Sequence, residues 1–319
     1  MKKIAVLFLS VLVVAQAEAQ ERQAAGTTSP TPPPSTPAAV VRPTPDTHGV
    51  DMRTQAGPAG PRYSPPVPVD EKLPSFWLIG DSTVRNGSAG DGTNMNQWGW
   101  GAPLTFYFDS KKVNVVNRAL GGTSARSFYS SATNWKAMVD LIKPGDVVIM
   151  QFGTNDGSYP GGLGEETKEM TGRGGQKEMV HTYGWYLRQL ISETKAKGAT
   201  PIVCSLIPRK RWDDTGHIKR DKETFAGWAG EVARAENVGF IDLNELSARR
   251  LEALGKAKVD LLYVPNPTPE KPAGETVHPG WEGAVINAEE VVSGLKALKN
   301  NPVAAYFSEK AKSIPAAAP

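Results

Sequence analysis

A short apolar run that ends in Gly-Asp-Ser constrains the fold of this chain more than any other stretch. Residues 76–79 read Phe-Trp-Leu-Ile, and Gly80, Asp81 and Ser82 follow directly. A continuous apolar run stopped by turn residues is typical of a strand buried on both faces of a parallel sheet. Ser82 would then lie at the strand's carboxyl end, the edge where open α/β sheets bind ligands. Asp and Ser are also ordinary turn and helix-capping residues, so this stretch alone does not establish a site.

Similar apolar runs recur along the chain and alternate with stretches of helical spacing. Apolar residues recur every three or four positions over residues 183–194 and 284–295, which indicates amphipathic helices. Strands that alternate with helices predict a mostly parallel sheet covered on both faces. We therefore expect an α/β fold, a three-layer α/β/α sandwich with a five-stranded, mostly parallel sheet. The predicted strands are residues 76–79, 113–117, 146–152, 201–207 and 238–242.

The two ends of the chain differ in composition from its middle. Residues 1–19 combine a basic start, an apolar run and an Ala-Glu-Ala cleavage site, which predicts a signal peptide that is removed on export. Residues 20–74 hold 13 of the chain's 26 prolines and few large apolar residues, which predicts a disordered Pro-rich linker. The folded domain is then expected over residues 75–300, and a C-terminal tail over residues 301–319.

Charge and cysteine content argue against several kinds of partner. The net charge of +3 is mild and the Lys and Arg residues do not form a stripe, so we expect no nucleic-acid partner. Cys204, the single cysteine, lies in an apolar run and is expected to be a buried structural thiol. We expect no metal or organic cofactor, because the sequence has no His/Cys cluster with ligand spacing and no glycine-rich phosphate loop. No later segment predicts membrane insertion, and the oligomeric state is not indicated.

Four polar blocks at predicted strand ends or in loops supply the residue types that hydrolysis through a serine requires. This chemistry needs a nucleophile, a base, a group that orients the base, and donors for the oxyanion. Each block also has a plainer explanation, since Gly121-Gly122 suits a tight turn and Asn155 begins a turn sequence. Their joint occurrence in this order favours the catalytic explanation. The blocks are residues 80–83, 117–127, 153–157 and 275–279.

Together these blocks resemble the SGNH (GDSL-type) hydrolases and, within that group, the rhamnogalacturonan acetylesterases. The resemblance covers residues 75–300 and implies the SGNH variant of the flavodoxin-like fold. Four further stretches agree with it: residues 98–101 (Trp-Gly-Trp-Gly), 124–127 (Ser-Ala-Arg-Ser), 181–186 (His-Thr-Tyr-Gly-Trp-Tyr) and 197–203.

The resemblance implies a role for each of four residues. Ser82 is the nucleophile, and its backbone N–H is one oxyanion donor. Gly122 supplies a second backbone N–H, and Asn155 supplies a side-chain amide. His278 is the general base and then the general acid for the departing sugar hydroxyl.

The acid of the triad departs from the family pattern. The family's usual acid is an Asp three residues before the His, and here that position holds Glu275. Triads with Glu exist, so we predict that Glu275 orients His278. The alternatives are a backbone carbonyl, Glu270 or Glu282.

Trp100 and Arg209 are the predicted substrate-binding residues. Trp100 belongs to the Trp-Gly stretch, where its ring serves either as a sugar platform or as part of the core. Arg209 follows the fourth predicted strand and should lie at the same edge as Ser82. A cation there can pair with galacturonate carboxylates. A solvated basic loop is the alternative.

The resemblance implies an exported serine esterase, secreted or periplasmic, that removes acetyl groups from a plant cell-wall polysaccharide. The implied partner is the acetylated polysaccharide, above all pectic rhamnogalacturonan. One alternative is an esterase for acetylxylan or another acetyl-glycan. A lipase or thioesterase is less favoured, because no long exposed apolar stretch is present for an acyl chain. A non-catalytic carbohydrate-binding protein is the alternative from a different class.

Overall fold

The computed structural model describes residues 65–86, 96–172, 175–265, 267–270 and 272–318. The predicted signal peptide and most of the predicted linker lie outside the described residues.

Five parallel strands form the central sheet, as predicted. They are β1 (Ser75–Gly80), β2 (Asn114–Asn117), β3 (Val147–Gln151), β6 (Thr200–Cys204) and β7 (Gly239–Ile241). Their order, β2-β1-β3-β6-β7, places the first strand between the second and the third, as in flavodoxin-like sheets. Leu78 lies opposite Asn117, and Gly80 lies opposite Gln151. The polar blocks that follow β1, β2 and β3 therefore emerge together at one edge of the sheet.

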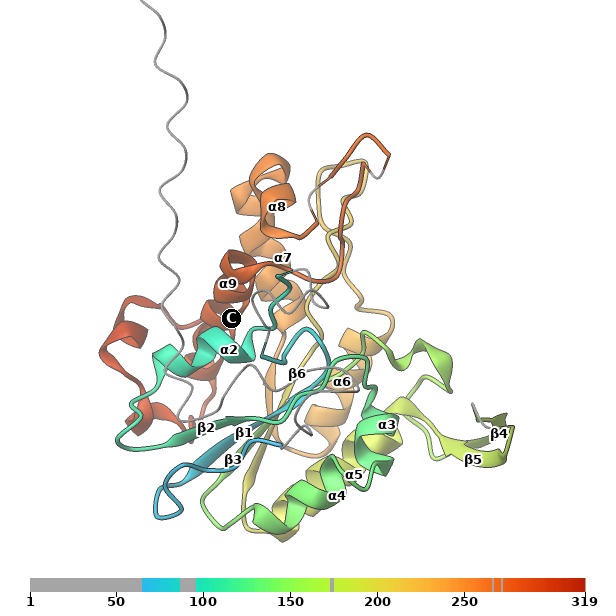
Figure 1. Cartoon of the computed structure of the whole chain (residues 1–319), viewed down its shortest axis with the longest axis vertical. Coiled ribbons are helices and arrows are strands. Elements are labelled where there is room, and N and C mark those ends of the chain that lie inside the picture. The colour runs from blue at the N-terminus through green and yellow to red at the C-terminus, as the bar shows by residue number, and fades with distance from the viewer. Residues whose placement is uncertain (1–64, 87–95, 173–174, 266, 271, 319) are drawn as a thin grey trace, which may run out of the picture. The chain divides into compact units, whose positions relative to one another are not determined.

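Helices cover both faces of the sheet (Figure 1). On one face lie α2 (Gly101–Leu104), α7 (Leu243–Leu254) and α9 (Trp281–Ala297), and on the other lie α3 (Ala125–Ser130), α4 (Trp135–Met138), α5 (Tyr183–Ala196) and α6 (Phe225–Ala235). Side chains of β1 alternate between the two cores, with Phe76 and Leu78 in one and Trp77 and Ile79 in the other. A parallel sheet needs this double cover, which explains why its strands are apolar on both faces.

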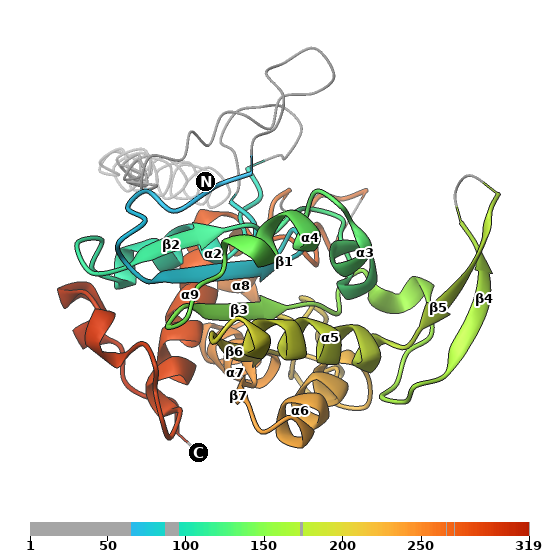
Figure 2. The same cartoon turned by 90° about the horizontal axis from the view of Figure 1, so that it is seen from below.

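A two-stranded hairpin between β3 and α5 was not predicted. Its strands, β4 (Thr167–Thr171) and β5 (Lys177–His181), pair only with each other within the described part of the chain. Figure 2 shows the hairpin extending away from α5. Most of its residues are exposed, and Val180 at its base is buried.

The domain begins before residue 75, where the linker was predicted to end. Nδ2 of Asn114 donates to the backbone carbonyl of Asp70 at 2.8 Å, and Oδ1 of Asn114 accepts from the backbone N–H of Asp70 at 3.1 Å. Arg118 donates to the backbone carbonyl of Pro66 at 2.8 Å. Polar contacts to β2 and the loop after it thus attach the end of the predicted linker.

The described residues after 300, predicted as a tail, pack into the domain instead. The ring of Phe307 stacks on Phe108 with 5.3 Å between centroids, and Tyr306 packs edge-on against Phe76 at 5.3 Å. Because Phe76 belongs to β1, this C-terminal segment (residues 302–318) completes the core on one face of the sheet. Backbone hydrogen bonds also hold it there, from Asp109 N–H to the Tyr306 carbonyl at 2.8 Å and from Ser308 N–H to the Tyr107 carbonyl at 2.9 Å.

Cys204 is a buried free thiol, as predicted. Among the described residues, no helix combines the length and the apolar character that crossing a membrane requires.

Candidate active site

Ser82 lies in a tight turn at the carboxyl end of β1. Oδ1 of Asp81 accepts hydrogen bonds from the backbone N–H and from the hydroxyl of Thr83, both at 2.8 Å. A Cβ on Gly80 would lie 2.6 Å from the carbonyl oxygen of Gln151, so the turn requires glycine there. Asp81 and Thr83 are buried, whereas Ser82 between them is half-buried. The turn therefore leaves Ser82 within reach of solvent.

His278 reaches Ser82 from the far end of the chain. Ser82 Oγ and His278 Nε2 are 2.9 Å apart, although 196 positions separate the two residues in sequence. A hydroxyl hydrogen-bonded to an imidazole that can take its proton is an activated nucleophile. In the reactive state Nε2 accepts this proton, so Nδ1 carries the ring hydrogen. The structure brings the predicted nucleophile and base together.

Glu275 is bound chiefly to its own loop and approaches His278 with its second oxygen. Oε1 of Glu275 accepts from the backbone N–H groups of Thr276 and Val277, both at 2.7 Å. Oε2 lies 3.7 Å from Nδ1 of His278, which is too long for a hydrogen bond. Nδ1 is buried and has no hydrogen-bond partner among the described residues. Glu275 and His278 are therefore neighbours, but no hydrogen bond joins the carboxylate to Nδ1.

The surroundings of Glu275 favour its ionised form. Burial opposes ionisation, yet the backbone N–H groups of Val277 and Thr276 and the adjacent His278 outweigh it and lower the pKa of Glu275. A carboxylate there can stabilise an imidazolium. Glu270 and Glu282, the alternative acids, are both exposed.

The second and third polar blocks meet beside Ser82. Gly122 is exposed and has a φ of 77°, which glycine adopts readily. Nδ2 of Asn155 donates to the backbone carbonyl of Thr123 at 3.0 Å, and the Thr123 hydroxyl lies 3.1 Å from the carbonyl oxygen of Gly80. An amide nitrogen carries two donors, and the contact with Thr123 uses one of them. Both predicted oxyanion residues therefore lie in loops attached to the end of β1.

Asp156 joins these two blocks and was overlooked at the sequence level. Its Oδ1 accepts from the backbone N–H of Ala125 and its Oδ2 from that of Gly153, both at 2.8 Å, and the hydroxyl of Tyr159 also donates to it. Burial raises the pKa of Asp156 to about 7, against the opposing effect of these hydrogen bonds. In the sequence Asn155-Asp156-Gly157 this Asp resembles an ordinary turn residue, and only its burial distinguishes it.

Trp100 does not fit its predicted role in substrate binding. Its side chain is 0% exposed and packs in the core beside α2, where Nε1 donates to Oε1 of Gln151 at 2.7 Å. A ring with no exposed face cannot stack on a sugar. The alternative explanation, a core aromatic, is correct.

Arg209 lies beside the third block. It is half-buried and donates through Nη2 to the backbone carbonyl of Thr154 at 3.3 Å, next to Asn155. The adjacent Lys210 is buried and pairs with Asp260 at 2.9 Å. Arg209 thus contacts the loop that carries Asn155, and its role in substrate binding stays a prediction.

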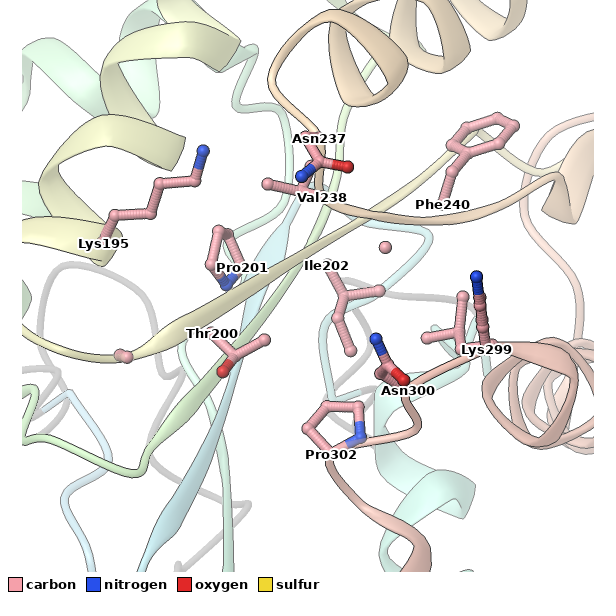
Figure 3. Close-up of a pocket in the computed structure, with 13 residues that line it drawn as sticks. Lys195, Thr200, Pro201, Ile202, Asn237, Val238, Phe240, Lys299, Asn300 and Pro302 are labelled. Atoms are coloured by element: carbon pink, nitrogen blue, oxygen red, sulfur yellow. The ribbon is translucent and has the colours of Figure 1, made fainter.

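A cleft of about 560 Å³ lies elsewhere, at the amino ends of β6 and β7 (Figure 3). It contains none of the predicted site residues, because the polar blocks are at the opposite, carboxyl edge of the sheet. Residues lining the cleft include Lys195, Thr200, Ile202, Asn237, Phe240 and Lys299.

Among the described residues, no group of three or more His, Cys, Asp or Glu side chains could hold a metal ion.

Comparison with known families gives one match over most of the domain. The sequence model of the GDSL-like lipase/acylhydrolase family matches residues 78–286. This span runs from the strand before Ser82 into the helix after His278, and it includes all four polar blocks.

Individual relatives match over a similar share of the chain. The rhamnogalacturonan acetylesterase of Emericella nidulans is 30% identical over 230 residues, which are 69% of this chain and 84% of that protein. The probable rhamnogalacturonan acetylesterase YesY of Bacillus subtilis is 31% identical over 223 residues, 70% of this chain and 93% of YesY. The crystal structure of Bacillus subtilis YxiM superposes with a TM-score of 0.55 at 27% identity, over 70% of this chain and 56% of YxiM.

Proposed function

Because this chain belongs to the GDSL-like lipase/acylhydrolase family, we propose that it is a serine esterase that removes acetyl groups from a plant cell-wall polysaccharide, above all pectic rhamnogalacturonan. The observation that carries the proposal is the 2.9 Å contact between Ser82 Oγ and His278 Nε2 at the carboxyl edge of the sheet. The proposed substrate is taken from the names of two relatives.

Acylation of Ser82 is the first half of the reaction. His278 Nε2 takes the hydroxyl proton while Oγ attacks the acetyl carbonyl carbon. The resulting oxyanion is stabilised by the backbone N–H groups of Ser82 and Gly122 and by the amide of Asn155. When the intermediate collapses, the bond to the sugar oxygen breaks and His278 returns the proton to that oxygen. The sugar hydroxyl departs, and the acetyl group stays on Ser82.

Deacylation repeats these steps with water. His278 takes a proton from water as the water oxygen attacks the acetyl carbon, and the same donors stabilise the second oxyanion. Collapse breaks the bond to Ser82 Oγ, and His278 returns the proton to that atom. Acetate leaves and the enzyme is restored.

Glu275 acts on the imidazole in both halves. As a carboxylate near Nδ1 it favours the tautomer with hydrogen on Nδ1, and it stabilises the imidazolium that each proton transfer forms. The 3.7 Å separation must shorten by about 0.5 Å for a direct hydrogen bond.

Two further features support the substrate and the location. Arg209 offers a guanidinium next to the oxyanion loop, where it can pair with the carboxylate of a galacturonate residue. Residues 1–19 have the pattern of an export signal, so the enzyme is secreted or periplasmic and meets the polysaccharide outside the cell.

The test is acetate release from acetylated rhamnogalacturonan, acetylated xylan and acetylated chitin fractions, with the Ser82→Ala protein as the control. We expect the fastest release from rhamnogalacturonan. Faster acetate release from xylan would contradict the proposed rhamnogalacturonan substrate but would still support an esterase. A wild-type protein that leaves p-nitrophenyl acetate and all three polymers intact, yet binds one of them, would be a carbohydrate-binding protein.

A further inference from the structure

The Trp-Gly-Trp-Gly stretch, residues 98–101, lies directly against the turn that holds Ser82. The backbone N–H groups of residues 99–101 donate to the backbone carbonyls of residues 83–85, each at 3.0 Å. A Cβ on Gly99 would lie 2.4 Å from the carbonyl carbon of Val84, and one on Gly101 would lie 2.5 Å from its carbonyl oxygen. The two glycines therefore allow this close backbone contact, which larger residues would prevent.

A chain of buried side chains continues from this stretch to the nucleophile turn. Nε1 of Trp100 donates to Oε1 of Gln151 at 2.7 Å, and Nε2 of Gln151 donates to Oγ1 of Thr83 at 2.6 Å. Oγ1 of Thr83 donates to Oδ1 of Asp81 at 2.8 Å. All four side chains are at most 1% exposed. Bulk water therefore does not compete for these hydrogen bonds.

The chemistry of the four groups gives this chain a single direction. An indole nitrogen can only donate, so Trp100 selects the carbonyl oxygen of the Gln151 amide and turns its NH₂ group towards Thr83. Because Thr83 then accepts from Gln151, its own hydrogen is directed to Asp81. Each hydrogen bond in such a buried network polarises and orders the next one.

We propose that Trp100 and Gln151 are positioning residues for Ser82 and act on it through Thr83 and Asp81. This inference rests on the proposed esterase function. Ser82 lies between Asp81 and Thr83, and both neighbours are held by the chain. A shift of this turn moves Oγ relative to His278 Nε2, from which it is 2.9 Å distant. Catalytic rates are sensitive to such shifts, since a misplacement of about 1 Å costs about 10²-fold.

Trp77, in β1, provides a control for Trp100. Its side chain is also 0% exposed, and its Nε1 donates to Oδ2 of the buried Asp146 at 2.9 Å. This contact lies at the amino edge of the sheet, away from Ser82. Trp100→Phe and Trp77→Phe each remove one buried indole donor. Oε1 of Gln151 then loses its partner, whereas Oδ2 of Asp146 keeps the hydrogen bond from the backbone N–H of Lys143 at 3.0 Å. Both variants should therefore lower the melting temperature, Trp100→Phe by more than Trp77→Phe.

The experiment measures kcat and KM for an acetate ester and the rate at which a fluorophosphonate labels Ser82. We expect Trp100→Phe to lower kcat and the labelling rate by about 10-fold, with KM within about twofold, as a partial misplacement predicts. Trp77→Phe should keep kcat, KM and the labelling rate near their wild-type values. A second pair, Thr83→Val and the control Thr194→Val, covers the case in which Trp100→Phe does not fold. Thr194 is buried, and its hydroxyl donates to the backbone carbonyl of Leu190 in α5.

The outcomes separate the two proposals. Equal losses in Trp100→Phe and Trp77→Phe, or no loss in Trp100→Phe and Thr83→Val, would overturn the positioning role. If the wild type is labelled at Ser82 but releases no acetate, the proposed activity fails, and slower labelling of Trp100→Phe still supports positioning. A wild type that is not labelled at Ser82 would overturn both.

Discussion

Ser82 and His278 share one hydrogen bond, yet they are held in place by different means. Ser82 follows β1, and all six residues of that strand are buried. The next residue, Thr83, accepts a hydrogen bond from the buried amide of Gln151. His278 lies in the loop between α8 (Lys256–Leu262) and α9. Backbone hydrogen bonds to other loops hold this segment, from Lys210 N–H to the Thr276 carbonyl at 2.7 Å and from Trp98 N–H to the Pro279 carbonyl at 2.9 Å.

This difference separates two kinds of sensitivity. Ser82, the proposed nucleophile, is placed by the packed sheet, so changes to the buried side chains that hold its turn should affect stability and rate together. His278, the proposed base, is placed by a few contacts within half-buried loops, which contribute less to the free energy of unfolding. Substitutions in the His278 loop should therefore change rate while stability stays nearly constant.

Removing the nucleophile itself is the strongest test of the comparison. Ser82→Ala should lower kcat by about 10⁶-fold, the loss measured when the nucleophile of a serine protease is removed. The melting temperature should stay close to that of the wild type, because Ser82 is half-buried and its neighbours carry the hydrogen bonds of the turn. Acetate release and thermal unfolding measure both quantities. A variant that retained near-wild-type turnover would disprove the assignment.

Glu275→Gln tests the loop side. The variant keeps an oxygen for the backbone N–H groups of Thr276 and Val277 but loses the charge near Nδ1 of His278. We expect kcat to fall by orders of magnitude, with about 10⁴-fold as the upper reference, and little change in melting temperature. Glu275→Asp should cost less if the loop adjusts. A kcat within a few-fold of wild type for both variants would give the orienting role to another group.

Asn155→Ala tests the donors on the sheet side. We expect kcat to fall by about 10²–10³-fold with a smaller change in KM, since the amide matters mainly in the transition state. Steady-state kinetics with an acetate ester give both constants. Asp156 continues to hold the loop in this variant, so the melting temperature should change little. An unchanged kcat would identify Asn155 as an ordinary turn residue.

Asp156→Asn concerns stability more than rate. Burial raises the pKa of Asp156 from 3.8 to about 7. The folded protein therefore keeps a proton between about pH 4 and about pH 7 that the unfolded chain has released, and stability falls as pH rises through this window. The Asn variant cannot ionise, so its free energy of unfolding should depend less on pH there. Denaturant unfolding at several pH values measures this.

The matched control for this pH series is Asp214→Asn, which changes an exposed carboxyl and should keep the wild-type slope. The pKa of Asp81 is also raised by burial, so Asp81 contributes to the slope in all three proteins. Because the charges of Asp81 and Asp156 disfavour each other, the contribution of Asp81 should be smaller in the Asp156→Asn variant. A wild-type slope in the Asp156 variant would contradict the prediction.

Arg209→Ala should have the smallest effect. If its guanidinium pairs with a galacturonate carboxylate, KM for acetylated rhamnogalacturonan should rise about two- to fivefold, the worth of a solvent-accessible ion pair. KM for neutral acetylxylan should stay unchanged, which provides the internal control. Equal changes on both substrates would indicate that Arg209 supports the Thr154 carbonyl rather than the substrate.

The parts of the fold that could be predicted are those with a local physical signal. Strands buried on both faces must be continuously apolar, so β1, β3 and β6 were recognisable, and the loops after them had to meet at one edge. The β4–β5 hairpin is polar and largely exposed, so it has no such signal. The environment of Trp100 depends on which residues lie across the sheet, and that information is not in its neighbours along the chain.

The site shows the same limit. Ser82, Asn155 and His278 could be proposed from the sequence because each stands in a block of distinctive residue types. Asp156 was missed, because an Asp in a turn sequence does not show whether it will be buried. Glu275 stood in the expected position, but whether it contacts Nδ1 depends on a few tenths of an ångström in a loop. Sequence patterns do not contain that distance.

The packing of the C-terminal segment on β1 also sets an order of events during synthesis. Phe76 is made early, whereas Tyr306, which covers it, is made more than two hundred residues later. Until residues 302–318 have left the ribosome, one face of β1 lacks part of its apolar cover. Incomplete chains therefore expose apolar surface that chaperones can bind. This delay would suit the proposed export, because a chain that cannot close early stays competent to be threaded through a membrane.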